Sequence, residues 1–308
     1  KGSPYMANRL VTASLLAFFL PLNLQAGPFF VGYGSETTGG GTNPASQCLV
    51  KNLNDDGPGS LRDCATRKGS TWVKFSVSGE IKLQKVLRPL GDKTIDGSGQ
   101  NILISGKKLV LIDIRKDNVI ISDLKFQIDQ DSGSKCEKPV LSTDTKNCGV
   151  AVMIKGSTNK VWIHHNLFRS CGEKCITSGY DLAGNVPDKI SISHNSFLDS
   201  FYAILIEAIP NKAYTEKKFT HVSIYNNHFR NIFRRSPRIA GFVRGHVMNN
   251  FIEQWGKEGV ANCKGEDSAF ASSSVGEAEM FLERNIYPRH FIAPAPVWAN
   301  PLLTRMTW

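Results

Sequence analysis

Acidic residues are scarce relative to basic ones in this 308-residue chain. Asp and Glu number 27 against 37 Lys and Arg, which gives a formal net charge of +10 with histidine neutral. A surplus of this sign favours a polyanionic partner, such as a nucleic acid, an acidic lipid or an acidic polysaccharide. A stripe of interleaved basic and aromatic residues is missing, so we expect no nucleic-acid partner.

Long apolar runs are also lacking, with one exception near the N-terminus. Residues 6–26 begin with Met6 and a basic residue, continue through the nearly unbroken apolar run Leu10–Leu22 and end at Ala26. This order is typical of a secretory signal, and the run is too short to span a membrane. We therefore predict a signal peptide at 6–26, export to the extracellular space or the periplasm, and no membrane association. Lys1–Tyr5 are interpreted as residues left from cloning.

Cysteine is sparse, with seven residues in the chain. An exported protein is expected to form disulfides, although the sequence alone does not determine their connectivity. Pairing of sequence neighbours predicts three disulfides and one free thiol: Cys48–Cys64, Cys136–Cys148, Cys171–Cys175, and Cys263. Cys171 and Cys175 could instead form half of a zinc site, but no second His or Cys pair at a suitable spacing stands out.

Long amphipathic helices are missing from the interior of the chain, which argues against an alternating β-α-β sheet. In their place a ten-residue pattern recurs, with an alternating β-branched strand, then polar residues or an asparagine, then an aromatic residue. Its copies are 117–126, 159–168, 188–197 and 220–229, with shorter echoes at 245–252 and 280–287. Similar units at irregular spacing of this size indicate a solenoid with loops inserted on each turn.

The strand period within each unit indicates which solenoid this is. Apolar residues at alternate positions indicate strands, and one stacked strand per turn gives an all-β, single-stranded parallel β-helix over residues 27–308. The repeated asparagine should stack at a bend, where its side chain bonds to the backbone and tolerates left-handed dihedral angles. The repeated phenylalanines should fill the interior: Phe126, Phe168, Phe197 and Phe229. A β-sandwich with a coincidental repeat remains the alternative.

Shorter signals precede the repeats. Residues 27–47 are rich in glycine and have no helical period. Ser60 should cap a short helix that ends near Ala65. Strands are predicted at 50–53 and at 71–77.

Seven short motifs follow one another between residues 30 and 287. They are Gly32-Tyr-Gly-Ser-Glu-Thr-Thr-Gly39, Leu53-Asn-Asp-Asp-Gly-Pro-Gly-Ser-Leu-Arg62, Phe75-Ser-Val-Ser-Gly-Glu-Ile81, Lys93-Thr-Ile-Asp-Gly-Ser-Gly99, Gly156-Ser-Thr-Asn-Lys-Val-Trp-Ile-His-His165, Arg235-Ser-Pro-Arg238 with His246-Val-Met-Asn-Asn250, and Glu283-Arg-Asn285. Each is weak alone, but in this order they resemble the pectate lyase family of polysaccharide lyases, which also contains the pectin lyases. The resemblance implies a right-handed parallel β-helix that is secreted and cleaves polygalacturonate by β-elimination.

The same resemblance implies roles for two arginines. Arg235 corresponds to the catalytic arginine of the family, and Arg238 to an arginine that binds substrate. Elimination removes the proton beside the C6 carboxylate and expels the glycosidic oxygen at C4, so the site must neutralise that carboxylate and supply a base. An arginine makes an unusual base because its pKa lies above roughly 12. Stabilisation of the developing enolate by Arg235 therefore stays open beside proton removal.

The family usually holds calcium with several carboxylates, which are hard oxygen ligands. Most of them are missing here. His164 replaces the aspartate of a Trp-Ile-Asp-His motif, residues 149–152 contain no acid, and of two acids on the next turn Thr177 and Asp181 keep one. The resemblance therefore implies at most a reduced calcium site centred on Asp181.

Three interpretations follow from the missing carboxylates. The enzyme could work without calcium, as pectin lyases in the family do, with Lys155, Arg169 or Lys174 serving as fixed cations in its place. It could bind calcium between the substrate carboxylates and Asp181, helped by Glu173 or Glu207. Or it could bind an acidic glycan, as in adhesion, without cleaving it.

Two further residues are candidate substrate contacts. Tyr202 takes the place of a substrate-binding lysine of the family. His165 lies next to His164 in a predicted strand, where histidines more often stack as structural side chains. We predict a monomeric lyase acting on polygalacturonate, pectin or a related polyuronate. A hydrolase is disfavoured, because the acids do not fall in a matching motif of paired carboxylates.

Overall fold

The structure is a computed structural model that describes residues 31–41, 46–107, 110–129, 149–181, 184–208, 218–256, 270–288, 297–299 and 305–307. The predicted signal peptide, Cys136, Cys148 and Cys263 lie outside these residues, so those predictions stay open. Within the described residues the chain forms 24 strands and one helix, α1 (Leu61–Ala65). No helix in this part of the chain is long and apolar enough to cross a membrane.

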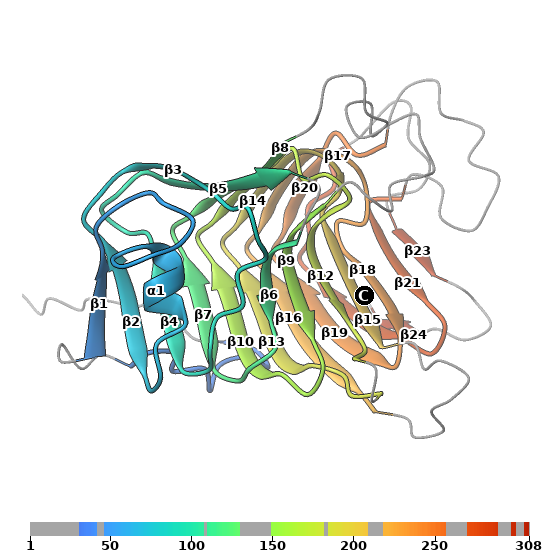
Figure 1. The fold of residues 1–308 in the computed structure, drawn as a ribbon. Coiled ribbons are helices and arrows are strands. Elements are labelled where there is room, and N and C mark those ends of the chain that lie inside the picture. The colour runs from blue at the N-terminus through green and yellow to red at the C-terminus, as the bar shows by residue number, and fades with distance from the viewer. Residues whose placement is uncertain are drawn as a thin grey trace, which may run out of the picture.

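The strands form three sheets that run the length of the molecule (Figure 1). Sheet 1 has ten strands: β1 (Gln47–Val50), β2 (Thr71–Phe75), β4 (Lys93–Asp96), β7 (Val119–Ser122), β10 (Asn159–His164), β13 (Asp188–Ser193), β16 (Thr220–Tyr225), β19 (Val243–Met248), β22 (Glu279–Glu283) and β24 (Arg305–Thr307). Sheet 2 has seven: β3 (Gly79–Lys82), β5 (Ile102–Lys107), β8 (Lys125–Asp129), β11 (Leu167–Arg169), β14 (Ser196–Tyr202), β17 (His228–Arg234) and β20 (Phe251–Glu253). Sheet 3 also has seven: β6 (Val110–Ile114), β9 (Val150–Lys155), β12 (Lys174–Gly179), β15 (Ile204–Ala208), β18 (Arg238–Gly241), β21 (Ser272–Val275) and β23 (Val297–Ala299).

The chain passes through the three sheets in turn, so each turn of the coil adds one strand to each sheet. The strands β7, β8 and β9 make one turn, β10, β11 and β12 the next, and β13, β14 and β15 the one after. These strands pair in parallel with their equivalents on adjacent turns. The predicted parallel β-helix is confirmed, and a β-sandwich of antiparallel sheets is excluded.

The repeated phenylalanines form an interior ladder, as predicted. They occupy register positions on successive strands of sheet 2, with ring centroids 4.8, 5.0 and 4.8 Å apart. All four are buried: Phe126, Phe168, Phe197 and Phe229. This spacing equals the usual distance between strands, so the backbone period itself stacks the rings.

The repeated asparagines form a second ladder at the bend between sheets 1 and 2. Its members are Asn166, Asn195, Asn227, Asn250 and Asn285. Each of the last four accepts, through Oδ1, the backbone N–H of the asparagine one turn earlier at 3.0 Å, and Asn166 accepts the N–H of Leu124 at the same distance. The left-handed φ falls on the residue before each asparagine, for example 55° at His165 and His194, rather than on the asparagine as expected.

The N-terminal region confirms the predicted helix and moves a predicted strand. Ser60 caps α1 by accepting the N–H of Asp63 at 3.1 Å. The strand expected at 50–53 lies instead at 47–50, because the Lys51 N–H donates to the carbonyl of Gly59 in the following turn. The 71–77 strand is present but shorter, as β2.

Both disulfides expected among the described cysteines are present. Cys48–Cys64 joins β1 to α1, and Cys171–Cys175 closes a short loop at the start of β12. The proposed zinc half-site at Cys171 and Cys175 is excluded, because the disulfide removes the thiolates that zinc requires.

A glycine-rich strap, residues 31–41, crosses the outer face of sheet 1. Its backbone N–H groups donate to side chains on β13, just before β7 and on β4 at 2.8–2.9 Å: Gly34 to Ser191, Gly39 to Asn118 and Gly40 to Thr94. A Cβ on Gly40 would lie 2.1 Å from the carbonyl oxygen of Thr71. Glycine is therefore required for the strap to approach the sheet this closely.

Candidate active site

The arginine-rich stretch forms the corner between sheet 2 and sheet 3. The strand β17 ends at Arg234, Arg235 turns the chain with a φ of 67°, and β18 begins at Arg238. Ser236 is buried behind this turn, and its backbone carbonyl accepts a hydrogen bond from the Ser272 hydroxyl at 2.9 Å. The arginines are thus held between two sheets, with the backbone between them anchored to the next turn.

Two predicted site residues occupy the same corner on earlier turns. Lys174 begins β12, and Tyr202 ends β14 just before β15. At the corner the Cys175 N–H donates to the Ala203 carbonyl at 3.1 Å, and the Ile204 N–H donates to the Arg235 carbonyl at 2.8 Å, so the three backbone segments stack on successive turns. Adjacent turns lie about 4.8 Å apart. The structure therefore brings together a set that we name the arginine corner: Lys174, Tyr202, Arg234, Arg235 and Arg238.

Tyr202 lies against the guanidinium groups of this corner. The Arg235 Cζ lies 3.8 Å from the Tyr202 ring centroid, and the Arg234 Cζ lies 5.2 Å from it. Tyr202 is only 6% exposed. A guanidinium stacked on a ring keeps its N–H groups in its own plane, where they can donate to a carboxylate. Tyr202 thus supports the arginines, and its predicted contact with substrate stays a prediction.

The charge of the corner is strongly positive. It contains three guanidinium groups, while the charge of the Lys174 ammonium is balanced by an ion pair with Glu173. Arg234, which the sequence analysis did not single out as a site residue, also lies over the Phe201 and Phe233 rings at 5.5 and 5.3 Å. The sequence did contain an indication of this role, because Arg234 belongs to a run of three arginines within residues 234–238.

Lys155 and Asp181 lie at the opposite end of the sheet 3 strands. Lys155 ends β9 and pairs in register with Gly179 at the end of β12, two residues before Asp181. The six residues of β12 place this end roughly 17 Å from Lys174. A Cβ on Gly156 would lie 3.0 Å from Asp181 Oδ2, so this carboxylate lies against the end of β9. These two residues therefore lie near each other and away from the arginine corner.

The described residues around Asp181 do not fit a calcium ion. Both carboxylate oxygens accept hydrogen bonds from Asn185, at 2.8 Å from its backbone N–H and 3.0 Å from its side chain. The adjacent strand ends in the cation Lys155. Calcium takes six to eight oxygen ligands, and among the described residues no group of three His, Cys, Asp or Glu could hold a metal. Asp181 instead stabilises its own turn.

The remaining predicted site residues lie elsewhere. Arg169 ends β11 in sheet 2 and forms an ion pair with Asp199 at 3.1 Å. Through Leu198 its strand position aligns with Arg230, which lies five residues before Arg235. His165 lies at the bend between sheets 1 and 2, where its ring stacks on that of His194 with centroids 4.9 Å apart. The structure does not bring either residue to the arginine corner.

His164 lies on sheet 1 and not on sheet 3. It belongs to β10, whereas the arginine corner lies between sheets 2 and 3, and Asp181 follows β12 of sheet 3. The interpretation of His164 as the replacement of a calcium ligand was therefore wrong, because its position is not near Asp181. Trp162 on the same strand is buried, although it lies on the outward-facing row of the sheet.

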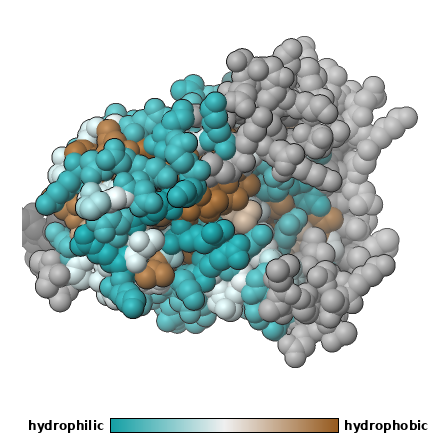
Figure 2. Space-filling view, in the orientation of Figure 1, coloured by the Kyte–Doolittle hydropathy of each residue, from teal (hydrophilic) through white to brown (hydrophobic). Residues whose placement is uncertain are grey.

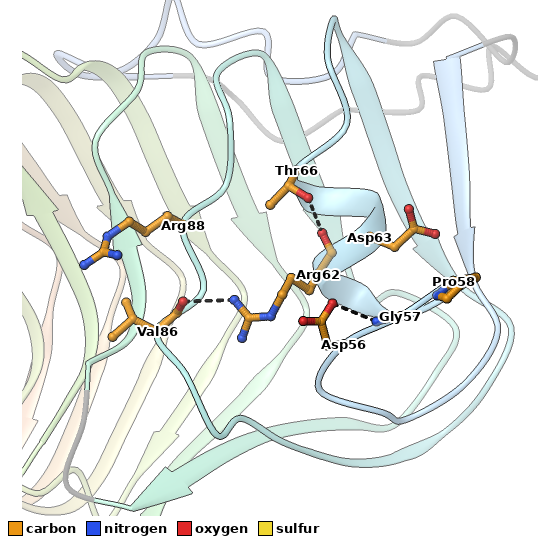
Figure 3. A pocket seen from close by; sticks show the side chains of 8 residues that line it. All are labelled: Asp56, Gly57, Pro58, Arg62, Asp63, Thr66, Val86 and Arg88. Atoms are coloured by element: carbon orange, nitrogen blue, oxygen red, sulfur yellow. Dashed lines mark hydrogen bonds between the residues drawn. The ribbon is translucent and has the colours of Figure 1, made fainter.

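A hollow of about 520 Å³ beside α1 offers a further candidate (Figure 3). Its arginine, Arg62, donates to Asp55 Oδ1 at 2.7 Å and to the carbonyls of Lys85 and Val86 at 2.7 and 2.9 Å. These internal bonds use the charge and the N–H groups of Arg62. The hollow is therefore structural. Figure 2 shows, in the orientation of Figure 1, a mainly hydrophilic face with hydrophobic groups gathered near its centre.

Comparison with known proteins agrees with this architecture. The model of the pectate lyase family matches residues 74–289. The chain is 31% identical over 231 residues to probable pectate lyase 6 of Arabidopsis thaliana, covering 73% of this chain and 49% of that protein. It is 30% identical over 242 residues to pectate lyase 1 of Hesperocyparis arizonica, covering 73% and 61%. The chain thus spans about half to three-fifths of the length of these relatives.

A solved structure shares the fold. Jun a 1, the major allergen from cedar pollen, superposes with a TM-score of 0.67 at 21% identity, covering 90% of this chain and 80% of that one. This likeness supports the right-handed parallel β-helix expected from the sequence. The family match over most of the described coil, with 31% identity to a pectate lyase, shows that the chain belongs to the pectate lyase family.

Proposed function

We propose that this chain is a lyase that cleaves polygalacturonate, or a related polyuronate, by β-elimination. The observation that carries the proposal is the arginine corner, where Arg235 stacks on Tyr202 beside Arg238 and Lys174. Guanidinium groups bind carboxylates through planar, paired hydrogen bonds, and a polyuronate presents one carboxylate on every sugar. The names of the relatives, pectate lyases, support the same substrate.

The reaction breaks one C–H and one C–O bond. The proton on C5 is removed, the C4–O bond breaks, a double bond forms between C4 and C5, and the leaving oxygen takes up a proton. Negative charge spreads onto the carboxylate during proton removal, and fixed cations stabilise it most at that moment. In this proposal Arg238 and Lys174 hold the carboxylate, and Arg235 either removes the proton or stabilises the enolate.

We propose further that fixed cations take the part that calcium plays in the family. Asp181 is engaged by Asn185 and lies beside the strand that ends in Lys155. Lys174 and Arg238 lie in the arginine corner itself, where Lys174 is held by its ion pair with Glu173. No step therefore passes through a metal.

Ultraviolet absorbance of the unsaturated product tests both parts. Polygalacturonate and methylated pectin are each incubated with the protein, with calcium and with a chelator. The proposal expects product that persists in chelator. Product that disappears with chelator would show that calcium is required and would overturn the fixed-cation part alone. Silence in all four reactions, with salt-sensitive binding of polygalacturonate, would indicate a noncatalytic binder and overturn the lyase proposal.

Export remains part of the proposal. The disulfides Cys48–Cys64 and Cys171–Cys175 support an oxidising compartment. Fusion of residues 6–26 to a reporter should direct it out of the cytoplasm, and a reporter that stays inside would contradict the predicted signal.

A further inference from the structure

A cavity of about 780 Å³ opens on the outer face of sheet 1, between the strap and the strands β2, β4, β7 and β10. By register, one outward row on these strands reads Trp72, Thr94, Ile120 and Trp162. The two shorter side chains form a floor between indoles that lie three strands, or about 14 Å, apart. We name this cavity the tryptophan groove.

The next outward row supplies a fixed carboxylate. Asp96 is 7% exposed and accepts the Trp72 indole N–H at 3.0 Å, the Lys74 ammonium at 2.8 Å and the Ser98 N–H at 2.8 Å. Burial opposes the charge of Asp96, but the hydrogen bonds from Lys74 and Ser98 outweigh it and lower its pKa. The carboxylate is therefore charged and held in place.

His164 supplies a neutral polar group at the same wall. It is 9% exposed, its Nδ1 lies 2.8 Å from Nδ1 of His165, and its ring lies 3.7 Å from that of Trp162. Its Nε2 has no hydrogen-bond partner among the described residues, although the side chain lines the groove. Burial lowers the pKa of His164 to about 3, so the ring is uncharged at neutral pH. A polar nitrogen without a partner at a cavity wall is suited to bonding a ligand hydroxyl.

The groove differs from the arginine corner in charge. Asp96 and Asp123 line it, and Lys74 balances only one of them. This excess of negative charge repels a uronate carboxylate. An apolar floor with aromatic walls and a few fixed polar groups instead suits a sugar ring, whose C–H face packs on apolar surface while its hydroxyls form hydrogen bonds.

We propose that the tryptophan groove binds an uncharged sugar residue, separately from the acidic chain at the arginine corner. Galactotetraose and tetragalacturonate test this, because their rings differ at C6, where one carries a hydroxymethyl group and the other a carboxylate. The full chain, labelled with ¹⁵N at the indoles, is titrated with each, and the Trp72 signal is assigned through Trp72→Phe. We expect the Trp72 signal to shift with galactotetraose at concentrations at least tenfold lower than with tetragalacturonate.

Two filling variants and one matched control locate the binding. Ile120→Trp fills the floor, and Ser35→Trp blocks the groove from an exposed position on the strap, where folding is not at risk. Phe281→Trp places an indole on the same outward row of sheet 1, at an exposed position outside the groove. Both filling variants should weaken galactotetraose binding at least tenfold, while the control binds as the parent does. Lyase turnover should not change in any of these variants. The binding test does not depend on turnover, so it stays valid even if the parent protein shows no lyase activity.

Three results would overturn the proposal. The first is equal shifts with the two oligosaccharides, and the second is binding that survives both filling variants in folded protein. The third is no shift of Trp72 at saturating galactotetraose, which would mean that the groove is closed or filled by the chain itself.

Discussion

The arginine corner and the tryptophan groove are built on the same coil but present opposite chemistry. The corner lies at a bend between sheets and gathers cations around the Tyr202 ring, whereas the groove lies on the face of one sheet and places carboxylates beside a row that contains two indoles. The interior rows are constrained, since Phe126 and its equivalents must stack. Outward rows carry no such constraint, so each face of the coil can acquire its own ligand chemistry.

The sharpest way to separate the two regions is to remove Arg235. Arg235→Ala should lower kcat on polygalacturonate by about 10³-fold, because a lost donor to a developing oxyanion costs that much in other enzymes. Galactotetraose binding at the groove should not change. Initial rates of unsaturated product measure the first effect.

Arg284→Ala is the control for that loss. Its side chain is 78% exposed and lies at the bend between sheets 1 and 2. Turnover should match the parent. An Arg235→Ala protein with parental turnover would show that the corner is not the active site.

Acid should destabilise the folded protein through His164, which lines the groove. Below about pH 6.5 an unfolded His164 binds a proton, whereas the folded one stays neutral until about pH 3. The unfolded state therefore gains stability as the pH falls between these values, and His164 should cost the fold roughly 3 kcal/mol by pH 4. His164→Gln should remove this part of the pH dependence.

Urea unfolding of parent and His164→Gln at pH 7 and pH 4 measures the difference. Carboxylates affect both proteins alike, so the parent should lose more free energy of unfolding than the variant. Equal losses would mean that His164 titrates normally in the folded protein.

Tyr202 should have a smaller effect on turnover than Arg235. Tyr202→Leu removes the ring beneath Arg235 and should lower kcat by about tenfold, since a buried cation–π contact contributes up to about 2 kcal/mol. Tyr202→Phe keeps the ring and should retain at least half of kcat. A phenylalanine variant as poor as the leucine variant would show that the hydroxyl, and not the ring, is needed.

The smallest effect is expected at Arg169. Its side chain is 57% exposed and its partner Asp199 is 31% exposed, so their ion pair is weak. Arg169→Ala should keep turnover within twofold and stability within about 1 kcal/mol. A loss of turnover above fivefold would show that Arg169 contacts the substrate, and that the active site extends beyond the arginine corner.

Much of the coil could be predicted because its signals are local and repeated. The recurring asparagine and phenylalanine indicated the two ladders, and the spacing of the cysteines indicated both described disulfides. The resemblance in motif order indicated the family and Arg235. These features depend on neighbours in the chain or on the strand spacing, which is the same on every turn.

The composition of each face was decided only by the tertiary structure. Loops of different length separate the turns, so the sequence does not state which residues share a row. For this reason the support of Arg235 by Tyr202, the distance of Asp181 and His165 from the corner, and the pairing of Trp72 with Trp162 across a groove were not predictable. The sequence by itself determined a basic parallel β-helix of the pectate lyase kind. Which side chains meet on its surface depended on the register of one turn against the next, because that register is set by long-range strand pairing.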